Sequence, residues 1–274
     1  MVFGILGPNG AGKTNTIEIM EGLRKPTSGE VTVLGVDVVR RARAIKERIG
    51  VQLQAVSLIP NLTVRETIEM FAGLYERRAD PGTLLARMAL EDKRNAHVSK
   101  LSGGQRQRLS VALALVNDPE IVFLDEPTTG LDPAARRALW DIVRDLSRER
   151  RTVILTTHYM EEAEELCDRV AIMDHGRIIS LDTPANLVRG LGAERTIEAS
   201  LSGQTDAGWA QGLPGVRGAR IVDGVAVIST TEPTTTMRAL LDLEGEGIVV
   251  DDIRVRSATL EDVFISLTGR TLRD

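Results

Sequence analysis

The chain has 274 residues, of which 42% are hydrophobic and 27% charged, and its net charge of −5 argues against a nucleic-acid binder that works by bulk electrostatics. Its single cysteine, Cys167, excludes an internal disulfide and fits a reducing compartment. No stretch approaches the ~20 consecutive apolar residues of a transmembrane helix, so we expect a cytoplasmic protein that reaches a membrane only through a partner.

The first motif lies near the N-terminus. The apolar run Val2–Leu6 predicts a strand, and the run Thr14–Glu21 predicts a helix. Backbone N–H groups of a glycine-rich loop between them would point at phosphate oxygens, Lys13 would reach the β- and γ-phosphates, and the Thr14 hydroxyl would ligate Mg²⁺. The phosphate-binding pattern G-x-x-x-x-G-K-[ST] is matched by Gly7, Pro8, Asn9, Gly10, Ala11, Gly12, Lys13 and Thr14. We therefore predict a site for a nucleoside triphosphate.

Short runs rich in Val, Ile and Leu recur along the first two thirds of the chain. Continuous apolar runs of this length are typical of a buried parallel sheet. The runs are Val31–Leu34, Ile121–Asp125, Thr152–Thr156 and Arg169–Met173.

A further run, Ile49–Gln54, leads into a region with helical spacing, residues 55–100. In this region Thr63 and Glu66 have the spacing of a capping box, which predicts a helix start. Gln54 could sense a γ-phosphate or its metal ion, and on chemistry alone Gln52 is an equal candidate.

The segment Leu101–Gln105 opens a helix that we predict to run to about Val116. A serine and two glycines at a helix start leave a hydroxyl and backbone N–H groups free to face an anion. An ordinary N-cap with a turn needs only one glycine. We therefore predict a second anion site, formed by Ser102, Gly103, Gly104 and Gln105.

Polar residues follow two of the predicted strands at the edge where open α/β sheets bind ligands. Asp125 suits a contact to Mg²⁺, usually through water, and Glu126 could orient and deprotonate an attacking water. His158 emerges at the same edge and could donate a hydrogen bond to a γ-phosphate. Asp132 before Pro133 predicts the N-cap of another helix.

The composition and patterning of the sequence change after about Pro184. Just before it, Asp174–Arg177 predicts a hairpin turn, with His175 as a turn residue. Beyond it, Ser, Thr and Gly become frequent, short alternating runs appear, and a capping pattern at Thr259 predicts a final helix. We expect a small α+β domain there, without a catalytic constellation.

Taken in order, these motifs resemble those of the ATP-binding subunits of ABC transporters. They correspond to the Walker A loop (7–14), the Q-loop glutamine Gln54, the signature (101–105), the Walker B acids Asp125 and Glu126, the D-loop with Asp132, and the switch histidine His158. Residues 251–264 are similar to the C-terminal extension of the daunorubicin-resistance class of exporters. The resemblance implies an α/β fold, a P-loop NTPase-type mainly parallel sheet with a helical insert at about 55–100, over residues 1–184, and an accessory α+β domain over 185–274.

The resemblance also implies the roles of the residues. Asn15 and the Walker A loop would hold ATP, Thr14, Asp125 and Gln54 would hold Mg²⁺, and Glu126, His158 and Gln54 would act in hydrolysis. Two copies, or this chain and a paired ATPase subunit, would face head to tail. The partner's nucleotide would then be contacted by Ser102, Gly103, Gly104, Gln105 and Asp132.

The resemblance further implies that the dimer drives a separate integral membrane permease from the inner face of the cell membrane, with no nucleic-acid partner. One departure is that the family carries further strands and an adenine-stacking aromatic residue before the loop. We therefore expect that the true start lies upstream, or that the chain is truncated with impaired nucleotide binding. Two alternatives remain: a soluble ABC ATPase that acts on nucleic acid or ribosomes, and an inactive nucleotide-binding module.

Overall fold

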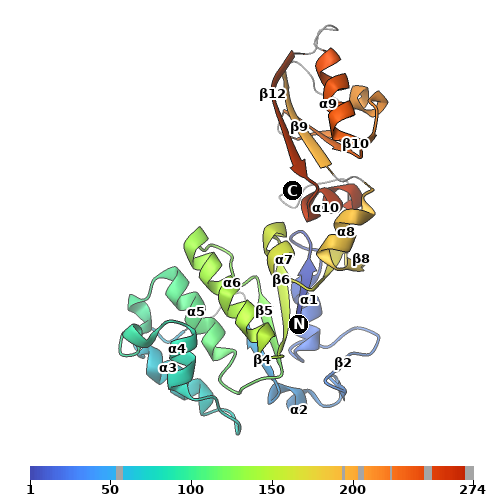
Figure 1. Cartoon of the computed structure of the whole chain (residues 1–274). Coiled ribbons are helices and arrows are strands. Elements are labelled where there is room, and N and C mark those ends of the chain that lie inside the picture. The colour runs from blue at the N-terminus through green and yellow to red at the C-terminus, as the bar shows by residue number, and fades with distance from the viewer. Residues whose placement is uncertain (54–57, 193–194, 203–206, 223, 244–248, 269–274) are drawn as a thin grey trace. The chain divides into compact units, whose positions relative to one another are not determined.

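The computed structural model describes residues 1–53, 58–192, 195–202, 207–222, 224–243 and 249–268 (Figure 1). It divides into two compact units, Met1–Leu181 and Asp182–Asp274. Among the described residues, no helix combines the length and the apolarity that crossing a bilayer requires.

The first unit is built on a six-stranded sheet in the order β4-β5-β6-β1-β7-β8. The pairings among the first five of these strands are parallel, which confirms the predicted mainly parallel sheet. Asp125 is in register with Thr156, and Leu6 with Thr157, so three strands end side by side at one edge. The strands are β1 (Val2–Leu6), β4 (Ile49–Gln52), β5 (Ile121–Asp125), β6 (Thr152–Thr157), β7 (Arg169–Asp174) and β8 (Arg177–Asp182).

Two helices of the first unit begin where the capping residues Thr63 and Asp132 predict. Thr63 and Glu66 form both hydrogen bonds of a capping box. Asp132 accepts hydrogen bonds from the N–H groups of Ala134 and Ala135. In Figure 1, α3 and α4 lie together near α5. The helices are α1 (Lys13–Met20), α2 (Ala42–Lys46), α3 (Val64–Ala72), α4 (Pro81–Arg87), α5 (Gly103–Leu113), α6 (Pro133–Arg148) and α7 (Met160–Leu166), with 3-10 turns at Glu91–Lys93 and Val98–Lys100.

Apolar side chains of the sheet and of α1 form a core cluster. Ile5, Ile17, Phe123 and Met173 belong to it and are almost fully buried. Cys167 is also buried, and burial raises the pKa of its thiol, as expected for a core residue. The apolar face of α6 is buried as well, at Leu139, Ile142, Val143 and Leu146.

One strand prediction is wrong. The run Val31–Leu34 does not join the parallel sheet, because the chain reverses there. The strands β2 (Thr32–Val33) and β3 (Val36–Asp37) form a separate antiparallel pair. Leu34 and Gly35 between them have φ values of 52° and 74°, the left-handed conformation of a two-residue hairpin turn. The two-residue turn, and not the apolar run, therefore decides how this segment pairs.

The hairpin predicted at 174–177 is confirmed. Strand β7 ends at Asp174, β8 begins at Arg177, and the two strands are neighbours in the sheet. His175 and Gly176 form the turn with φ values of 45° and 75°. The exposed His175 is thus a turn residue.

The second unit contains a four-stranded antiparallel sheet in the order β10-β11-β9-β12. Ile197, Ala199 and Ile228 of this sheet and Leu240 of α9 form its core. Its elements are α8 (Pro184–Gly190), β9 (Arg195–Ser202), a 3-10 turn (Gly208–Gly212), β10 (Val216–Val222), β11 (Val225–Thr230), α9 (Pro233–Asp242), β12 (Val249–Ser257) and α10 (Leu260–Thr268).

A buried carboxylate connects α10 to three strands of this sheet. Asp262 accepts hydrogen bonds from Arg256 at 2.7 and 3.1 Å, from Arg220 at 3.2 Å and from Thr196 at 3.2 Å. Burial pushes the pKa of Asp262 upward, but the bonds from Arg256 and Thr259 hold it below its usual range. Hydrogen bonds to this carboxylate therefore hold the second unit together in addition to its apolar core.

Candidate nucleotide site

The predicted phosphate loop connects β1 to α1 at the edge of the sheet. A Cβ atom on Gly7 would lie 2.3 Å from the backbone oxygen of Met173, so only glycine lets the loop begin this close to β7. The loop leads directly into α1 at Lys13. The positive end of the α1 dipole therefore adjoins the loop, an arrangement that favours a bound anion.

Lys13 is a buried positive charge inside this loop, with 5% of the residue exposed. Its Nζ donates hydrogen bonds to the backbone oxygens of Gly7 at 2.7 Å and Pro8 at 3.1 Å, and lies 3.7 Å from Oε1 of Glu126. Burial lowers the pKa of Lys13, whereas the carboxylates of Glu126 and Asp125 oppose that shift. An ammonium group in this position is suited to pair with phosphate oxygens.

Thr14 and Asp125 form the part of the site that suits a metal ion. The Thr14 hydroxyl donates a hydrogen bond to Oδ2 of Asp125 at 3.3 Å, and the Thr156 hydroxyl donates to Oδ1. A hydroxyl and a carboxylate oxygen are hard ligands of the kind that Mg²⁺ takes together with substrate phosphates. The residues present therefore fit a Mg²⁺ ion that binds with a nucleotide, and Thr156 orients the carboxylate.

Glu126 is held in an unusual backbone conformation at the same edge. Its φ is 46°, and its backbone N–H donates to the hydroxyl and the carbonyl oxygen of Thr156 at 3.0 and 3.1 Å. Its carboxylate accepts a hydrogen bond from Thr129 at 3.2 Å, and Oε2 lies 3.3 Å from Nδ1 of His158. A left-handed non-glycine residue that is held from several sides is typical of functional sites.

The structure thus brings five of the predicted residues together: Lys13, Thr14, Asp125, Glu126 and His158. Gln54, the predicted metal-sensing residue, lies outside the described residues. The alternative, Gln52, ends β4, is 2% exposed, and donates a hydrogen bond to the backbone oxygen of Leu53 at 2.6 Å. Asn15 is exposed in the first turn of α1.

Glu21, which directly follows α1, is a buried carboxylate that local sequence patterns do not indicate. It is 1% exposed, and neither of its carboxylate oxygens has a hydrogen-bond partner within the described part of the chain. Burial, and then the charges of Asp125 and Glu18, raise the pKa of Glu21 to about 7. A glutamate at the end of a surface helix normally predicts a solvated side chain, so no sequence signal marks this one as buried.

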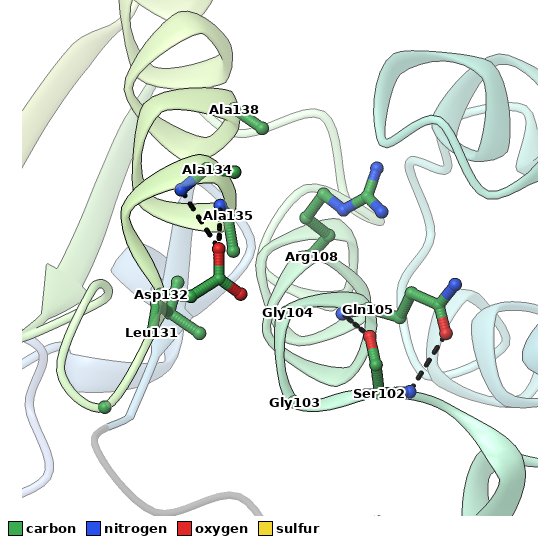
Figure 2. A pocket seen from close by; sticks show the side chains of 11 residues that line it. Ser102, Gly103, Gly104, Gln105, Arg108, Leu131, Asp132, Ala134, Ala135 and Ala138 are labelled. Carbon is green, nitrogen blue, oxygen red and sulfur yellow. Dashed lines mark hydrogen bonds between the residues drawn. The ribbon is translucent and has the colours of Figure 1, made fainter.

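The other predicted residues form a second group, at the N-terminal turns of α5 and α6. A pocket of about 530 Å³ is lined by Ser102 and Asp132, which precede α5 and α6, and by Gly103, Gly104 and Gln105 of α5. Figure 2 shows the two helix starts side by side, with Asp132 at one and Ser102 at the other. Because both helices direct their positive ends toward this region, it favours a negatively charged ligand.

The two glycines of this group have different surroundings. A Cβ atom on Gly104 would lie 3.0 Å from Cβ of Ala135, so glycine lets α5 pack closely against α6. A Cβ atom on Gly103 would meet nothing within 4 Å. Ser102 and Gln105 form a reciprocal capping box, in which the Ser102 hydroxyl accepts from Gln105 N–H at 3.2 Å.

The fold and these residues define a class, the P-loop ATPases with a mainly parallel sheet. Comparison with solved structures supports this class. A dimeric, post-hydrolysis ATP-binding cassette bound to ADP and Pi superposes with a TM-score of 0.60 at 28% identity, covering 66% of this chain and 84% of that one.

Sequence comparisons identify the family. The sequence profile described as "ABC transporter" matches residues 1–129. The daunorubicin resistance ATP-binding protein DrrA3 of Streptomyces coeruleorubidus is 40% identical, over 98% of this chain and 87% of that protein. The Nod factor export ATP-binding protein I of Rhizobium etli is 41% identical, over 98% and 85% of the two chains. The chain belongs to the ABC transporter family, as an ATP-binding subunit with the ATPase fold.

Proposed function

We propose that this protein hydrolyses ATP as the motor subunit of an exporter, and that nucleotide-driven dimerisation drives a separate membrane permease. The observation that carries the proposal is the convergence of Lys13, Asp125, Glu126 and His158 at one sheet edge. The names of the whole-length relatives, which concern drug resistance and Nod factor export, support the exporter class.

ATP would be held by the loop 7–14 and by Asn15 after it. Lys13 would exchange its bonds to loop carbonyls for stronger charge-assisted bonds to phosphate oxygens. Thr14 and Asp125 would hold Mg²⁺, which neutralises charge on the transferred phosphoryl group.

Glu126 is the general base of the proposed reaction. Its carboxylate would take a proton from the attacking water, and the Thr129 hydroxyl that donates to it would fix its orientation. His158, which lies against the same carboxylate, would donate a hydrogen bond to the charge that develops on the phosphoryl oxygens. Lys13 would stabilise the same charge from the loop side.

The second group of residues would bind the nucleotide held by another subunit. A pocket bordered by two helix N-termini suits the phosphates of a partner's ATP, and the dimeric cassettes among the structural neighbours support this arrangement. Hydrolysis would remove the phosphoryl group that both subunits share, so the dimer would open. The permease would place the protein on the inner face of the cell membrane.

Two measurements test the proposal. The purified chain should release phosphate from Mg-ATP, and Glu126→Gln should reduce turnover by about 10²–10⁴-fold while nucleotide still binds. Glu30→Gln, the same chemical change at an exposed loop residue, serves as the matched control. Equal turnover of the Glu126→Gln variant and the wild type would contradict the assigned base.

The exporter role is tested by isolation of the protein from its native membrane. Stable co-purification with a polytopic membrane protein, released on nucleotide hydrolysis or by high salt, supports the motor function. Co-purification with RNA or DNA in place of a membrane protein would instead indicate a soluble ABC ATPase that acts on nucleic acid.

A further inference from the structure

His158 is followed by an aromatic residue that is itself packed against a cation. The ring centroids of His158 and Tyr159 lie 4.2 Å apart, with an interplanar angle of 42°. The guanidinium carbon of Arg136, on α6, lies 4.5 Å from the centroid of the Tyr159 ring. Arg136, Tyr159, His158 and Glu126 therefore form a continuous row of contacts from α6 to the proposed general base.

A second contact fixes the same two segments to each other. Nε1 of Trp140 donates a hydrogen bond to Oε1 of Glu162 at 3.0 Å, and these residues are 6% and 0% exposed. Trp140 lies one turn after Arg136 on α6, and Glu162 lies three residues after Tyr159 in α7, so both contacts join the same face of α6 to the segment that carries His158.

The positive charge of Arg136 can interact with the face of the Tyr159 ring. Within the described part of the chain, its guanidinium makes no salt bridge, and its Nε has no hydrogen-bond partner. The charge of Arg136 acts on Glu162, where it opposes the upward shift that burial imposes on the pKa of that carboxylate. An arginine over an aromatic face is a favourable contact that fixes the plane of the ring.

His158 needs such support because it lies just beyond the sheet. Strand β6 ends at Thr157, so no strand pairing restrains the His158 side chain. The Tyr159 N–H donates to the Thr157 hydroxyl at 2.9 Å, which fixes the backbone but not the imidazole ring. Small displacements of a group that acts on the reacting atoms are costly, up to about 10²-fold in rate for about 1 Å.

We infer that Arg136 and Tyr159 are positioning residues for His158: their stacked contact holds the imidazole ring against Glu126, and the Trp140–Glu162 hydrogen bond fixes α6 to the switch segment. The inference rests on the proposed function for the role of His158. The helix that provides the support also borders the second pocket, through Ala134 and Ala135.

The kinetic test uses substitutions that separate the ring from its hydroxyl. Tyr159→Leu should lower kcat about 10-fold with the KM for ATP within about 2-fold of wild type, because the ring acts on the chemistry and not on ATP binding. Tyr159→Phe keeps the aromatic face and should retain most of the turnover. Arg136→Ala should lower kcat in the same way, Arg136→Lys should restore part of the loss, and Arg137→Ala, its exposed neighbour on α6, is the matched control.

A double substitution separates positioning from a general loss of stability. In a His158→Ala background, Tyr159→Leu should cause no further loss of kcat, since the residue that it positions is already absent. The inference is overturned if Tyr159→Leu costs the same factor with and without His158. It is also overturned if Tyr159→Phe is as impaired as Tyr159→Leu.

A spectroscopic measurement tests the contact independently of ATP hydrolysis. The chain has three histidines, His97, His158 and His175, so ¹³C-histidine labelling gives three ring signals, and His158→Ala assigns one of them. The Tyr159 ring current should displace the His158 signal, and both Tyr159→Leu and Arg136→Ala should move it, whereas Arg137→Ala should not. A His158 signal that is unmoved by Arg136→Ala overturns the inference. A protein that shows these shifts but no ATPase activity would contradict the proposed function alone.

Discussion

The ammonium of Lys13 lies 3.7 Å from the carboxylate of Glu126, although the two residues follow different, non-adjacent strands. Lys13 follows β1 through the phosphate loop, Glu126 follows β5, and β6 lies between these strands in the sheet. The two side chains therefore meet across the end of β6, beside Thr156 and His158. The loss of either side chain removes one half of this ion pair from a largely buried site.

We expect Lys13→Ala to weaken nucleotide binding by about 10- to 100-fold, because charge-assisted hydrogen bonds contribute roughly 1.5–3 kcal/mol. Titration with a fluorescent ATP analogue measures the affinity. Lys46→Ala, an exposed lysine on α2, removes the same charge and should leave the affinity unchanged. Equal affinities of the two variants would contradict the assigned role of Lys13.

Ser102→Ala tests the second pocket against a matched helix cap. Ser102 and Thr63 each close a capping box, on α5 and α3, so replacement by alanine should cost about 1 kcal/mol of stability in either case. Only Ser102 lines the pocket, so only Ser102→Ala should reduce ATP-dependent dimerisation. Size-exclusion chromatography with Mg-ATP, in a Glu126→Gln background that slows hydrolysis, reports the dimer. A dimer that is equally weakened by Thr63→Ala would attribute the effect to stability alone.

Glu21→Gln should stabilise the protein in a pH-dependent way. The pKa of Glu21 is about 7 in the folded protein, above its ordinary value of 4.5, so the folded chain binds more protons than the unfolded chain between these values. The free energy of unfolding therefore falls as the pH rises through this window, and the penalty stays in place above it. The variant should exceed the wild type by about 1–3 kcal/mol at pH 8 and approach it near pH 4.5.

Urea unfolding at several pH values measures this difference. Glu30→Gln, at an exposed position, provides the control and should show no such trend. A Glu21→Gln variant that is less stable than the wild type at pH 8 would mean that the charged carboxylate has a stabilising partner.

Asp262→Ala should destabilise the second unit by about 1–3 kcal/mol, because Arg220 loses its carboxylate partner and Arg256 keeps only its ion pair with Glu198. Hydrogen exchange of β9, β10 and β12 reports the loss, and Glu261→Ala, exposed on the same helix, is the control. Since the pKa of Asp262 is below its usual value, its contribution is present above about pH 4 and is lost on acidification below that range. Unchanged exchange rates would show that the apolar core alone holds the unit together.

Local patterns predicted a large part of this molecule. The phosphate loop, the caps at Thr63 and Asp132 and the turn at His175 depend on residues within a few positions of one another, so spacing alone identifies them. The run Val31–Leu34 failed because an apolar run and a two-residue turn compete at the same place, and the turn decided the pairing.

The sequence by itself therefore determined the class of site, since the residues of each motif lie close together along the chain. Only the tertiary structure decided that Lys13 meets Glu126, that Glu21 is buried without a hydrogen-bond partner among the described residues, and that Arg136 packs on Tyr159 beside His158. These relationships depend on strand order and helix packing, which join residues that are distant along the chain. Burial and packing then set the pKa and orientation of each side chain, and local residue spacing predicts neither burial nor packing.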